Sequence, residues 1–156
     1  MINIVSGQQF INNKEKFGIE GKVISFNEAM VDGNVIDNIF SDEFLKERCV
    51  THNISINEYE KITVSPLKNI NNYSSLNMYF GFDMFCQINL LTLLAYFDQI
   101  KFYPEIRIYI CDEVNLKVID TYNTSSHGYY SLFKEIIIKK GEFYALRRIW
   151  NSTKFN

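Results

Sequence analysis

Hydrophobic residues along the chain occur in short runs that polar, often Asn-rich, stretches separate. A run of four to eight residues rich in Ile, Val, Phe and Tyr, bounded by Gly, Pro, Asn or Ser, is typical of a β-strand. On this pattern we expect strands over Ile2–Val5, Lys22–Phe26, Lys61–Val64, Leu76–Phe80, Ile106–Ile110 and Leu116–Thr121.

Other segments carry the signals of helices. Ser41 is a suitable N-cap for a helix that runs to about Val50, and two acidic residues follow it, where they favour the helix N-terminus. Asp83 is a suitable N-cap for a helix over Met84–Phe97, which is apolar on nearly every side and is therefore expected to be buried. Two terminal helices are expected over Tyr129–Ile138 and Glu142–Asn151.

Strands that alternate with helices predict an α/β fold with a mainly parallel sheet. Right-handed crossovers place helices on both faces of such a sheet, which gives three layers in a Rossmann-like arrangement. The length of 156 residues fits a single domain. We therefore expect one α/β domain over residues 1–156, whose C-terminal strand and two helices occupy about 111–152.

Composition excludes several classes of protein. Hydrophobic residues make up 47% of the chain and charged residues 22%, which is the balance of a folded domain rather than a disordered one. The formal net charge of −2 argues against a nucleic-acid partner, because such proteins usually carry a basic surface. We interpret the one basic cluster as a solvated face: Lys139, Lys140, Arg147 and Arg148.

The cysteines and the apolar runs bear on location. Cys49, Cys86 and Cys111 are odd in number and have no CxxC spacing, so we expect free thiols in a reducing compartment. The first residues lack the basic and apolar regions of a signal peptide. The most apolar run, Phe85–Phe97, is shorter than the roughly 20 residues that cross a bilayer. These features predict a cytoplasmic protein with no membrane partner.

No familiar catalytic motif is present in the sequence. It lacks the glycine-rich phosphate loops and the GxSxG element of hydrolases. His52 and His127 are the only histidines, and neither has ligand spacing to a cysteine or to the other, so we expect no metal site. His127 lies in a Ser-Ser-His-Gly stretch that predicts an exposed loop. The sequence leaves the cofactor unknown.

The fold class itself predicts where a site would lie. In an open parallel sheet, ligands bind beyond the carboxyl ends of the strands. If the expected strands run parallel, the polar residues that follow them gather along one edge. With the glycines between them, the residues at these strand ends are Ser6, Gly7, Gln8, Asn27, Glu28, Gly81, Asp83, Gln87, Cys111, Asp112 and Glu113.

Near Asp83, each polar residue has a structural and a functional interpretation. Asp83 and Gln87 share a helix face and could contact a ligand, or Asp83 could simply cap the helix. Asn89 lies within the apolar helix, where an unpaired amide is costly, so it must bind either the protein or a ligand. Cys86 fits a small buried apolar residue, and it would be a nucleophile only if it were exposed with a lowered pKa.

Glu28 directly follows the second expected strand, where a general base or a hydroxyl-binding residue would be useful. It could equally pair with Arg48, because Arg binds carboxylates through two parallel hydrogen bonds. Both arrangements perturb the carboxylate, and the sequence leaves the choice between them open.

Two blocks of the sequence resemble a known family. The first is Phe26-Asn27-Glu28-Ala29-Met30 with the later Phe40-Ser41-Asp42-Glu43-Phe44 and Arg48. The second extends from Leu76 to Leu90 and contains Gly81-x-Asp83-x-Phe85-Cys86-Gln87-x-Asn89. Together they resemble the bacterial family called domain of unknown function eighteen-thirty-five, over roughly Met1–Ile110. Tyr144–Trp150 resembles the closing helix of that family less closely.

The resemblance implies no established activity and no cofactor. It does supply a shortlist of candidate ligand-binding residues, which are the positions of the family motifs in this chain. They are Asn27, Glu28, Arg48, Asp83, Cys86, Gln87 and Asn89.

Two functions of different classes fit these observations. The first is binding of a small polar or nucleotide-like ligand at the carboxyl edge, with or without catalysis, in which Glu28 is the acid/base or hydroxyl-binding group and Arg48 holds an anion. The second is a non-catalytic protein-interaction or self-association module. Its polar residues would be structural, and an aromatic surface such as Phe102-Tyr103 or Tyr129-Tyr130 would contact another protein or a second copy.

Overall fold

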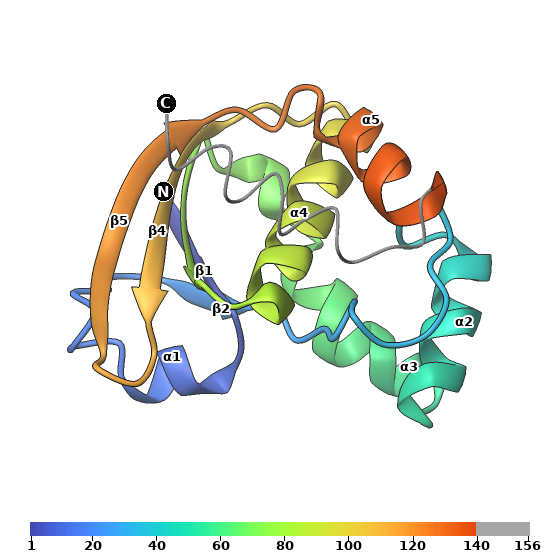
Figure 1. The fold of residues 1–156 in the computed structure, drawn as a ribbon, viewed down its shortest axis with the longest axis horizontal. Coiled ribbons are helices and arrows are strands. Elements are labelled where there is room, and N and C mark those ends of the chain that lie inside the picture. Colours follow the sequence, from blue (N-terminus) through green and yellow to red (C-terminus); the bar gives the residue numbers. More distant parts are fainter. Residues whose placement is uncertain (140–156) are drawn as a thin grey trace.

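The computed structural model, which describes residues 1–139, contains a five-stranded sheet that lies on one side of the central helix α4 (Met84–Gln99) (Figure 1). The strands lie in the order β2-β1-β3-β4-β5. Four of them run parallel, and β5 runs antiparallel to β4. The prediction of an α/β fold with a mainly parallel sheet is confirmed. The strands are β1 (Ile2–Val5), β2 (Val23–Ser25), β3 (Ser75–Gly81), β4 (Glu105–Asp112) and β5 (Lys117–Thr124).

The strand order reverses beside β1. After β1 the chain passes to its neighbour β2 on one side, and it then returns past β1 to form β3 on the other side. In parallel sheets of this kind, the carboxyl ends of the two strands at the reversal are the usual position for a ligand. Here these ends are Val5 of β1 and Gly81 of β3.

One face of the sheet is covered by the long helix α4 (Met84–Gln99), as Figure 1 shows. Leu90, Leu94 and Phe97 of this helix pack in one core with Met78 and Ile108 of the sheet. Both sides of α4 are covered, because further helices pack on the side away from the sheet. This position explains why the helix is apolar nearly all round, as the sequence predicted.

The helices outside α4 form a second core with it. Phe44, Tyr59 and Phe133 of these helices meet Ile88 and Ala95 of α4. Removing these large apolar side chains from water supplies the main driving force for docking the outer layer. The outer helices are α2 (Asp42–His52), α3 (Ile56–Tyr59) and α5 (Tyr129–Phe133).

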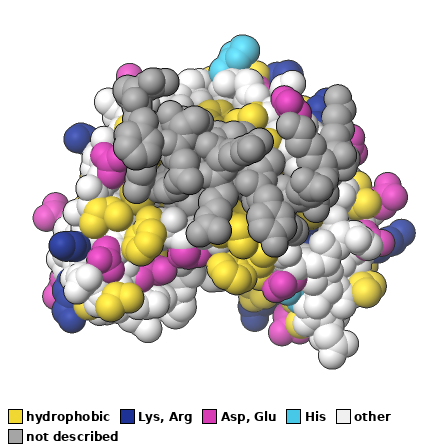
Figure 2. Space-filling view, viewed as in Figure 1, with side chains coloured by type: hydrophobic (Ala, Val, Ile, Leu, Met, Phe, Trp, Pro, Cys, Tyr) yellow, Lys and Arg dark blue, Asp and Glu magenta, His cyan; other side chains and the backbone are white. Residues whose placement is uncertain are grey.

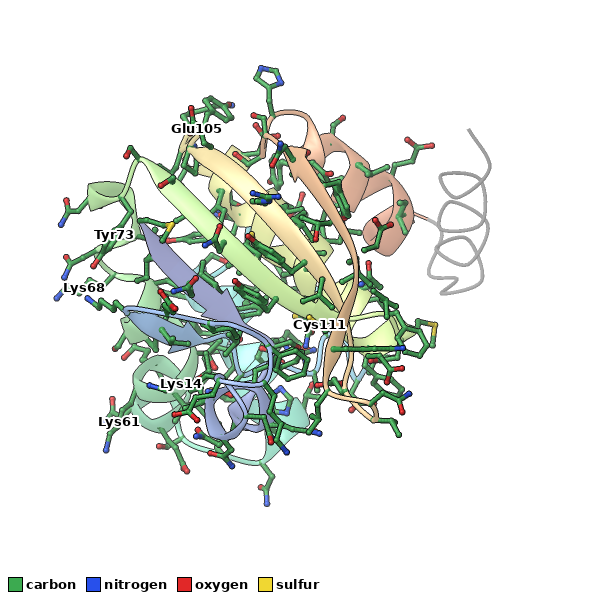
Figure 3. All side chains as sticks on the ribbon, turned by 90° about the vertical axis from the view of Figure 1, so that its left-hand side faces the viewer. Lys14, Lys61, Lys68, Tyr73, Glu105 and Cys111 are labelled. Atoms are coloured by element: carbon green, nitrogen blue, oxygen red, sulfur yellow. The ribbon has the colours of Figure 1, made fainter. Side chains whose placement is uncertain are left out.

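The opposite face of the sheet has a smaller cover. Phe10 of α1 (Gln8–Asn12) and the nearby Phe17 pack there against Tyr79. Figure 3 looks onto this face, and its labels Glu105 and Cys111 mark the two ends of β4. Among residues 1–139, α1 is the only helix that contributes to the apolar cluster on this face.

The segment between α3 and β3 corrects one prediction. The strand expected over Lys61–Val64 is wrong, because these residues belong to a π-helical turn. Buried side chains recur here at Tyr59, Thr63, Leu67 and Ile70, which is a helical spacing rather than the alternation of a strand. Three short helical elements follow α3: η1 (Glu60–Val64), η2 (Ser65–Leu67) and η3 (Ile70–Asn72).

Both predicted helix caps are present. The Ser41 hydroxyl accepts a hydrogen bond from the backbone N–H of Phe44 at 3.2 Å, and Asp83 caps α4 in the same way. The helices α1 and α3 were not predicted, because five and four residues are too few to show a helical period.

The C-terminal part of the described chain is helical, as predicted for Tyr129–Ile138. It consists of α5 followed by the π-helical η4 (Lys134–Lys139). The Asp98 carboxylate of α4 anchors this part by accepting the backbone N–H groups of Gly128 and Tyr130 at 3.1 and 3.0 Å. The predicted helix 142–151 lies outside the described residues, as do Lys140, Arg147 and Arg148.

Three smaller predictions are also settled by the structure. The three cysteines are free thiols, and all are buried. His127 is exposed, next to α5. Within residues 1–139, no helix has the length and the apolar character needed to cross a membrane.

Candidate functional site

The carboxyl ends of four strands lie along one edge of the sheet, because β1, β2, β3 and β4 run parallel. Ser6 follows β1 there, Glu28 follows β2, Asp83 follows β3 and Glu113 follows β4. The strand directions on which the predicted site depends are therefore present. The polar residues at this edge form two groups rather than one.

The first group, the Glu28 cluster, consists of Glu28, Arg48, His52 and Tyr59. Glu28 Oε1 lies 2.8 Å from Arg48 Nη2 and 2.6 Å from His52 Nε2. The same oxygen accepts the backbone N–H of Ala29, and Oε2 accepts the Tyr59 hydroxyl. The side chains of Glu28 and Arg48 are fully buried, whereas His52 is 25% exposed. The charge pair is thus closed off from solvent by its own partners.

Arg48 also fixes the loop that follows β2. Its Nη2 donates to the carbonyl of Ala29 at 2.8 Å, and its Nη1 donates to the carbonyl of Asp32 at 2.5 Å. These bonds attach the loop to α2. Of the two interpretations of Glu28 that the sequence left open, the geometry shows the pairing with Arg48.

Electrostatic interactions keep the Glu28 carboxylate ionised. Burial alone raises the pKa of Glu28, but the hydrogen bond and charge of Arg48 and the hydrogen bond from Tyr59 bring it below its usual value. Burial and the Glu28 carboxylate raise the pKa of Tyr59, so its hydroxyl remains protonated and donates. Both oxygens of Glu28 are therefore engaged by the protein itself, as ionised acceptors.

Asn89 connects α4 to the same loop. Its Nδ2 donates to the Glu28 carbonyl at 2.5 Å, and its Oδ1 accepts the backbone N–H of Met30 at 3.1 Å. The backbone carbonyl of Asn27 accepts the Thr63 hydroxyl of η1 at 3.0 Å, while its side-chain amide donates to Ser25 Oγ at 2.8 Å. The buried amide of Asn89 thus finds its partners within the protein, which is the structural one of its two interpretations.

The second group, the Gly81 cluster, consists of Ser6, Gly81, Asp83, Cys86 and Glu113. Carboxylate oxygens of Asp83 and Glu113 and the Sγ of Cys86 all lie within 4.8 Å of one another. The Ser6 hydroxyl donates to Cys86 Sγ at 3.4 Å. Cys86 is buried, while Asp83 and Glu113 are partly exposed. Figure 2 shows acidic side chains between the end of β4 and the start of α4, with hydrophobic ones beside them.

The lack of a side chain at Gly81 lets the donor atoms of this cluster approach the backbone closely. A Cβ atom at position 81 would lie 2.7 Å from Asp83 Oδ2, 3.0 Å from Cys86 Sγ and 3.0 Å from Glu113 Oε2. Asp83 contributes Oδ2 to this point, while its Oδ1 caps α4 by accepting the Cys86 N–H at 3.0 Å. Two carboxylate oxygens and one sulfur thus gather beside Gly81 at the carboxyl end of β3.

The described residues give the negative charge of the Gly81 cluster no basic partner. Within residues 1–139, no Lys, Arg or His forms an ion pair with Asp83 or Glu113. Burial and repulsion by Asp83 raise the pKa of Glu113. Burial raises the pKa of the Cys86 thiol to about 12, against an opposing hydrogen bond from Ser6. Cys86 is therefore a neutral thiol at pH 7, so the lowered pKa that a nucleophile needs is lacking.

The seven residues predicted from the sequence divide between the clusters. Asn27, Glu28, Arg48 and Asn89 form or border the Glu28 cluster. Asp83 and Cys86 belong to the Gly81 cluster, and Gln87 joins it by donating to the Gly81 carbonyl at 2.6 Å. In the described part of the chain, no hydrogen bond or ion pair joins side chains of one cluster to those of the other.

Sequence reasoning missed two partners of Glu28. His52 follows Arg48 by four residues on α2, so the helix places both on one face, and this signal was available in the sequence. Tyr59 comes from the short helix α3, which has no recognisable period. Glu113 was placed at the edge by the strand argument but was absent from the shortlist of ligand-binding residues.

Exposed hydrophobic side chains adjoin the Gly81 cluster. Phe82, Met84 and Phe85 are 49%, 43% and 56% exposed, and they surround Asp83 in the turn between β3 and α4. Large apolar side chains at the surface beside polar groups are a common feature of ligand sites. They offer contact to the apolar part of a bound molecule.

The donor atoms determine what the Gly81 cluster suits chemically. Carboxylate oxygens accept hydrogen bonds and attract positive charge, and carboxylates and cysteine sulfur both ligate metal ions. A phosphate group would be repelled by the two acids. The Glu28 cluster, by contrast, has its charges paired internally.

No family model matches the chain, and neither the curated proteins nor the solved structures give a match.

Proposed function

We propose that the protein binds a small polar ligand at the carboxyl edge of its sheet, in the Gly81 cluster. The observation that carries this proposal is the convergence of Asp83, Cys86 and Glu113 on one point beside Gly81. A second support is position, because the point adjoins β1 and β3, where the strand order reverses. We assign no reaction to the site.

The ligand carries positive charge or several hydrogen-bond donors. Asp83 and Glu113 are both acceptors and have no basic partner among the described residues, so a cation or a hydroxyl-rich group would relieve their repulsion. The exposed rings of Phe82 and Phe85 suit a flat apolar part. A nucleoside has both features, and a nucleotide would bring its phosphate towards two acids.

In this proposal the Glu28 cluster is structural. Its hydrogen bonds hold the loop after β2 against α2, and Asn89 holds the same loop against α4. Asn27, Glu28, Arg48 and Asn89 then support the edge of the sheet without touching the ligand. Asp83, Cys86 and Gln87 are the members of the predicted shortlist that lie at the binding point.

Three finer features also belong to the proposal. The sheet order and the parallel strands support a three-layer, Rossmann-like arrangement. The motif blocks around Glu28 and Asp83 support membership of the bacterial family of domain of unknown function eighteen-thirty-five. The three unpaired cysteines support a location in the reducing cytoplasm.

Thermal unfolding in the presence of a small panel of compounds tests the proposed function. The panel contains the four ribonucleosides, their 5′-monophosphates and putrescine. Bound ligand stabilises the native state by about 2.7 kcal/mol at a free concentration one hundred times the Kd, which raises the Tm measurably. We expect stabilisation by at least one neutral or cationic compound and none by the monophosphates.

Two matched variants locate the effect. Glu113→Gln removes one acid of the cluster and should abolish the stabilisation, whereas Glu105→Gln, at the other end of β4, should retain it. Stabilisation that is unchanged in Glu113→Gln, or a panel without any stabilising compound, contradicts the proposal.

A protein-interaction module is the second candidate, and β5 is the observation that favours it. This strand is an edge of the sheet, and its residues Val118, Ile119 and Tyr122 are 36%, 45% and 38% exposed. Unprotected edge strands pair readily with another chain. Of the aromatic surfaces predicted earlier, Phe102, Tyr129 and Tyr130 are partly buried against the cores, whereas Tyr103 is 42% exposed.

Light scattering on a size-exclusion column tests this second function. Self-association through β5 predicts a dimer that Ile119→Lys converts to a monomer. Val114→Lys is the matched control, because Val114 is 89% exposed but lies in the turn before β5. A monomer at all concentrations, or a dimer that persists in Ile119→Lys, excludes self-association through this strand.

A further inference from the structure

The side chains of the Gly81 cluster have the composition of a metal site as well as that of a site for a polar ligand. It offers two carboxylate oxygens and one thiol sulfur, and these come from two separate parts of the chain. Asp83 and Cys86 belong to the start of α4, whereas Glu113 follows β4. A solvated acidic surface presents carboxylates alone. The buried sulfur beside these two acids is therefore unusual for such a surface.

Gly81 provides an observation that is independent of the donor set. A Cβ atom at residue 81 would lie 2.7–3.0 Å from all three donor atoms, so glycine at this position lets the donors gather closely over the end of β3. Metal–oxygen and metal–sulfur bonds to zinc are about 2.0–2.3 Å. The three donor atoms lie within 4.8 Å of one another, so side-chain rotations would bring them to these distances from an ion beside Gly81 and clear of its Cα atom.

The surroundings of Cys86 also suit a bound cation. Its side chain is 9% exposed, and the Ser6 hydroxyl donates to Sγ at 3.4 Å. Outer hydrogen bonds of this kind hold ligating atoms in place. Within residues 1–139 no basic side chain neutralises Asp83 or Glu113. A divalent ion would neutralise the acids, and the thiol would lose its proton to solvent as the metal–sulfur bond forms.

We infer that the Gly81 cluster binds a divalent transition-metal ion of the zinc type through Cys86, Asp83 and Glu113. Cysteine sulfur selects such ions over magnesium and calcium, which prefer oxygen alone. Three protein ligands leave a fourth position open for water or for part of a substrate, the pattern of catalytic rather than structural zinc sites. This inference rests on the proposed function, since it names the class of ligand for the same site.

Cobalt is the probe, because a Co²⁺–thiolate bond produces a charge-transfer absorption that oxygen ligands do not. Co²⁺ is titrated into the full-length, reduced protein without oxygen. We expect the band in the wild type at one equivalent and its displacement by Zn²⁺. Cys86→Ser should abolish the band, and Glu113→Gln, at a partly exposed position, should weaken Co²⁺ binding by about tenfold or more. Cys49→Ser, in the outer core, should keep both band and affinity.

The outcomes separate this inference from the proposed function. No band in the wild type, or a band that persists in Cys86→Ser, overturns the metal site. If a nucleoside or putrescine still stabilises the wild type but not Glu113→Gln, the proposed function stands without the metal. If neither Co²⁺ nor any compound of the panel binds, both fail. Circular dichroism of Glu113→Gln shows whether that variant is folded, so the result does not depend on Cys86→Ser alone.

Discussion

At the scale of single residues, Glu28 carries its negative charge on a side chain that is fully buried. Its side chain and that of Arg48 are fully buried, and its oxygens meet Arg48, His52, Tyr59 and the backbone of Ala29. A buried ion pair contributes little compared with an apolar pair of the same shape, but the removal of one partner leaves an unpaired buried charge. The cluster therefore makes the fold intolerant of change at either residue.

The first prediction concerns Glu28→Gln. This variant leaves the buried Arg48 guanidinium without its counter-charge, so we expect the free energy of unfolding to fall by about 3 kcal/mol, as for other broken buried pairs. Urea unfolding followed by circular dichroism measures the loss. Glu20→Gln removes an exposed carboxylate and should change the free energy by less than about 0.5 kcal/mol. Equal stability of the two variants would contradict a closed, structural Glu28 cluster.

The second prediction concerns pH. The pKa of Glu28 lies below the usual value of 4.5 in the folded protein, because of Arg48 and Tyr59. The unfolded chain thus takes up the proton at higher pH than the native state does. The stability that ionised Glu28 contributes is fully present above pH 4.5 and is lost as the pH falls through the lowered native pKa.

Urea midpoints between about pH 3 and pH 7 test this dependence, over the range in which carboxylates titrate. The wild type should lose stability below the unfolded pKa, and Glu28→Gln should lose less over the same range because its amide does not titrate. Parallel curves for the two proteins would show that Glu28 is not the group responsible.

At the scale of elements, α4 organises the molecule. It packs on the sheet through one side and on α2, α3 and α5 through the other. Its polar residues have separate tasks: Asp83 caps its start, Asn89 holds the loop after β2, and Asp98 holds α5. The helix thus links both polar clusters to the outer layer.

The third prediction concerns Asp98 and α5. The Asp98 carboxylate accepts the backbone N–H groups of Gly128 and Tyr130 and the Tyr103 hydroxyl, and hydrogen bonds to a charged group contribute about 1.5–3 kcal/mol. Asp98→Asn should weaken these bonds and increase local opening of α5. Hydrogen exchange of the Gly128 and Tyr130 amides measures it directly.

Asp120→Asn is the control for this prediction. Asp120 lies on the exposed strand β5, and its carboxylate bonds only the N–H of the next residue, Thr121. This variant should leave the exchange of α5 unchanged. Undiminished protection of Gly128 and Tyr130 in Asp98→Asn would show that apolar packing alone holds α5.

The sequence predicted the elements that carry strong local signals. Ile2–Val5 and Met84–Phe97 have clear apolar patterns, and the caps Ser41 and Asp83 mark their helices correctly. The strand predicted over Lys61–Val64 was wrong because a short apolar run fits a strand and a helical turn equally. Only the burial of Thr63 and its neighbours reveals the helical period. Boundaries otherwise moved by one to three residues, as fraying ends do.

The candidate site was predictable in position but not in arrangement. Parallel strands bring Ser6, Glu28, Asp83 and Glu113 to one edge, and this follows from topology alone. Their division into two clusters depends on which side chains turn inward. Tyr59 and His52 close around Glu28 only because α3 packs against α2, a tertiary contact that no local pattern encodes.

At the scale of the whole molecule, the polar residues at the sheet edge form two clusters with different properties. The Glu28 cluster joins the inner sheet to the outer helices and keeps its charges paired, whereas the Gly81 cluster leaves two acids without a described counter-charge. The partly exposed carboxylates of Asp83 and Glu113 repel each other, and this repulsion contributes to the raised pKa of Glu113. A cation bound beside Gly81 would relieve that repulsion.

The fourth prediction tests this central claim by adding a methyl group at residue 81, against the three donor atoms. Gly81→Ala would place a Cβ atom 2.7–3.0 Å from Asp83 Oδ2, Cys86 Sγ and Glu113 Oε2, which are side-chain ends that can turn aside. We expect the variant to fold with a stability within about 1 kcal/mol of the wild type, since alanine suits a strand no less than glycine does. Ser75→Ala, at the other end of β3, is the matched control.

The decisive measurement is the Tm of Gly81→Ala, Ser75→Ala and the wild type, each with and without Zn²⁺ and the nucleoside panel. Binding beside Gly81 predicts that a compound or ion raises the Tm of the wild type and of Ser75→Ala but not that of Gly81→Ala. An equal rise in all three proteins would place the ligand elsewhere and contradict the account.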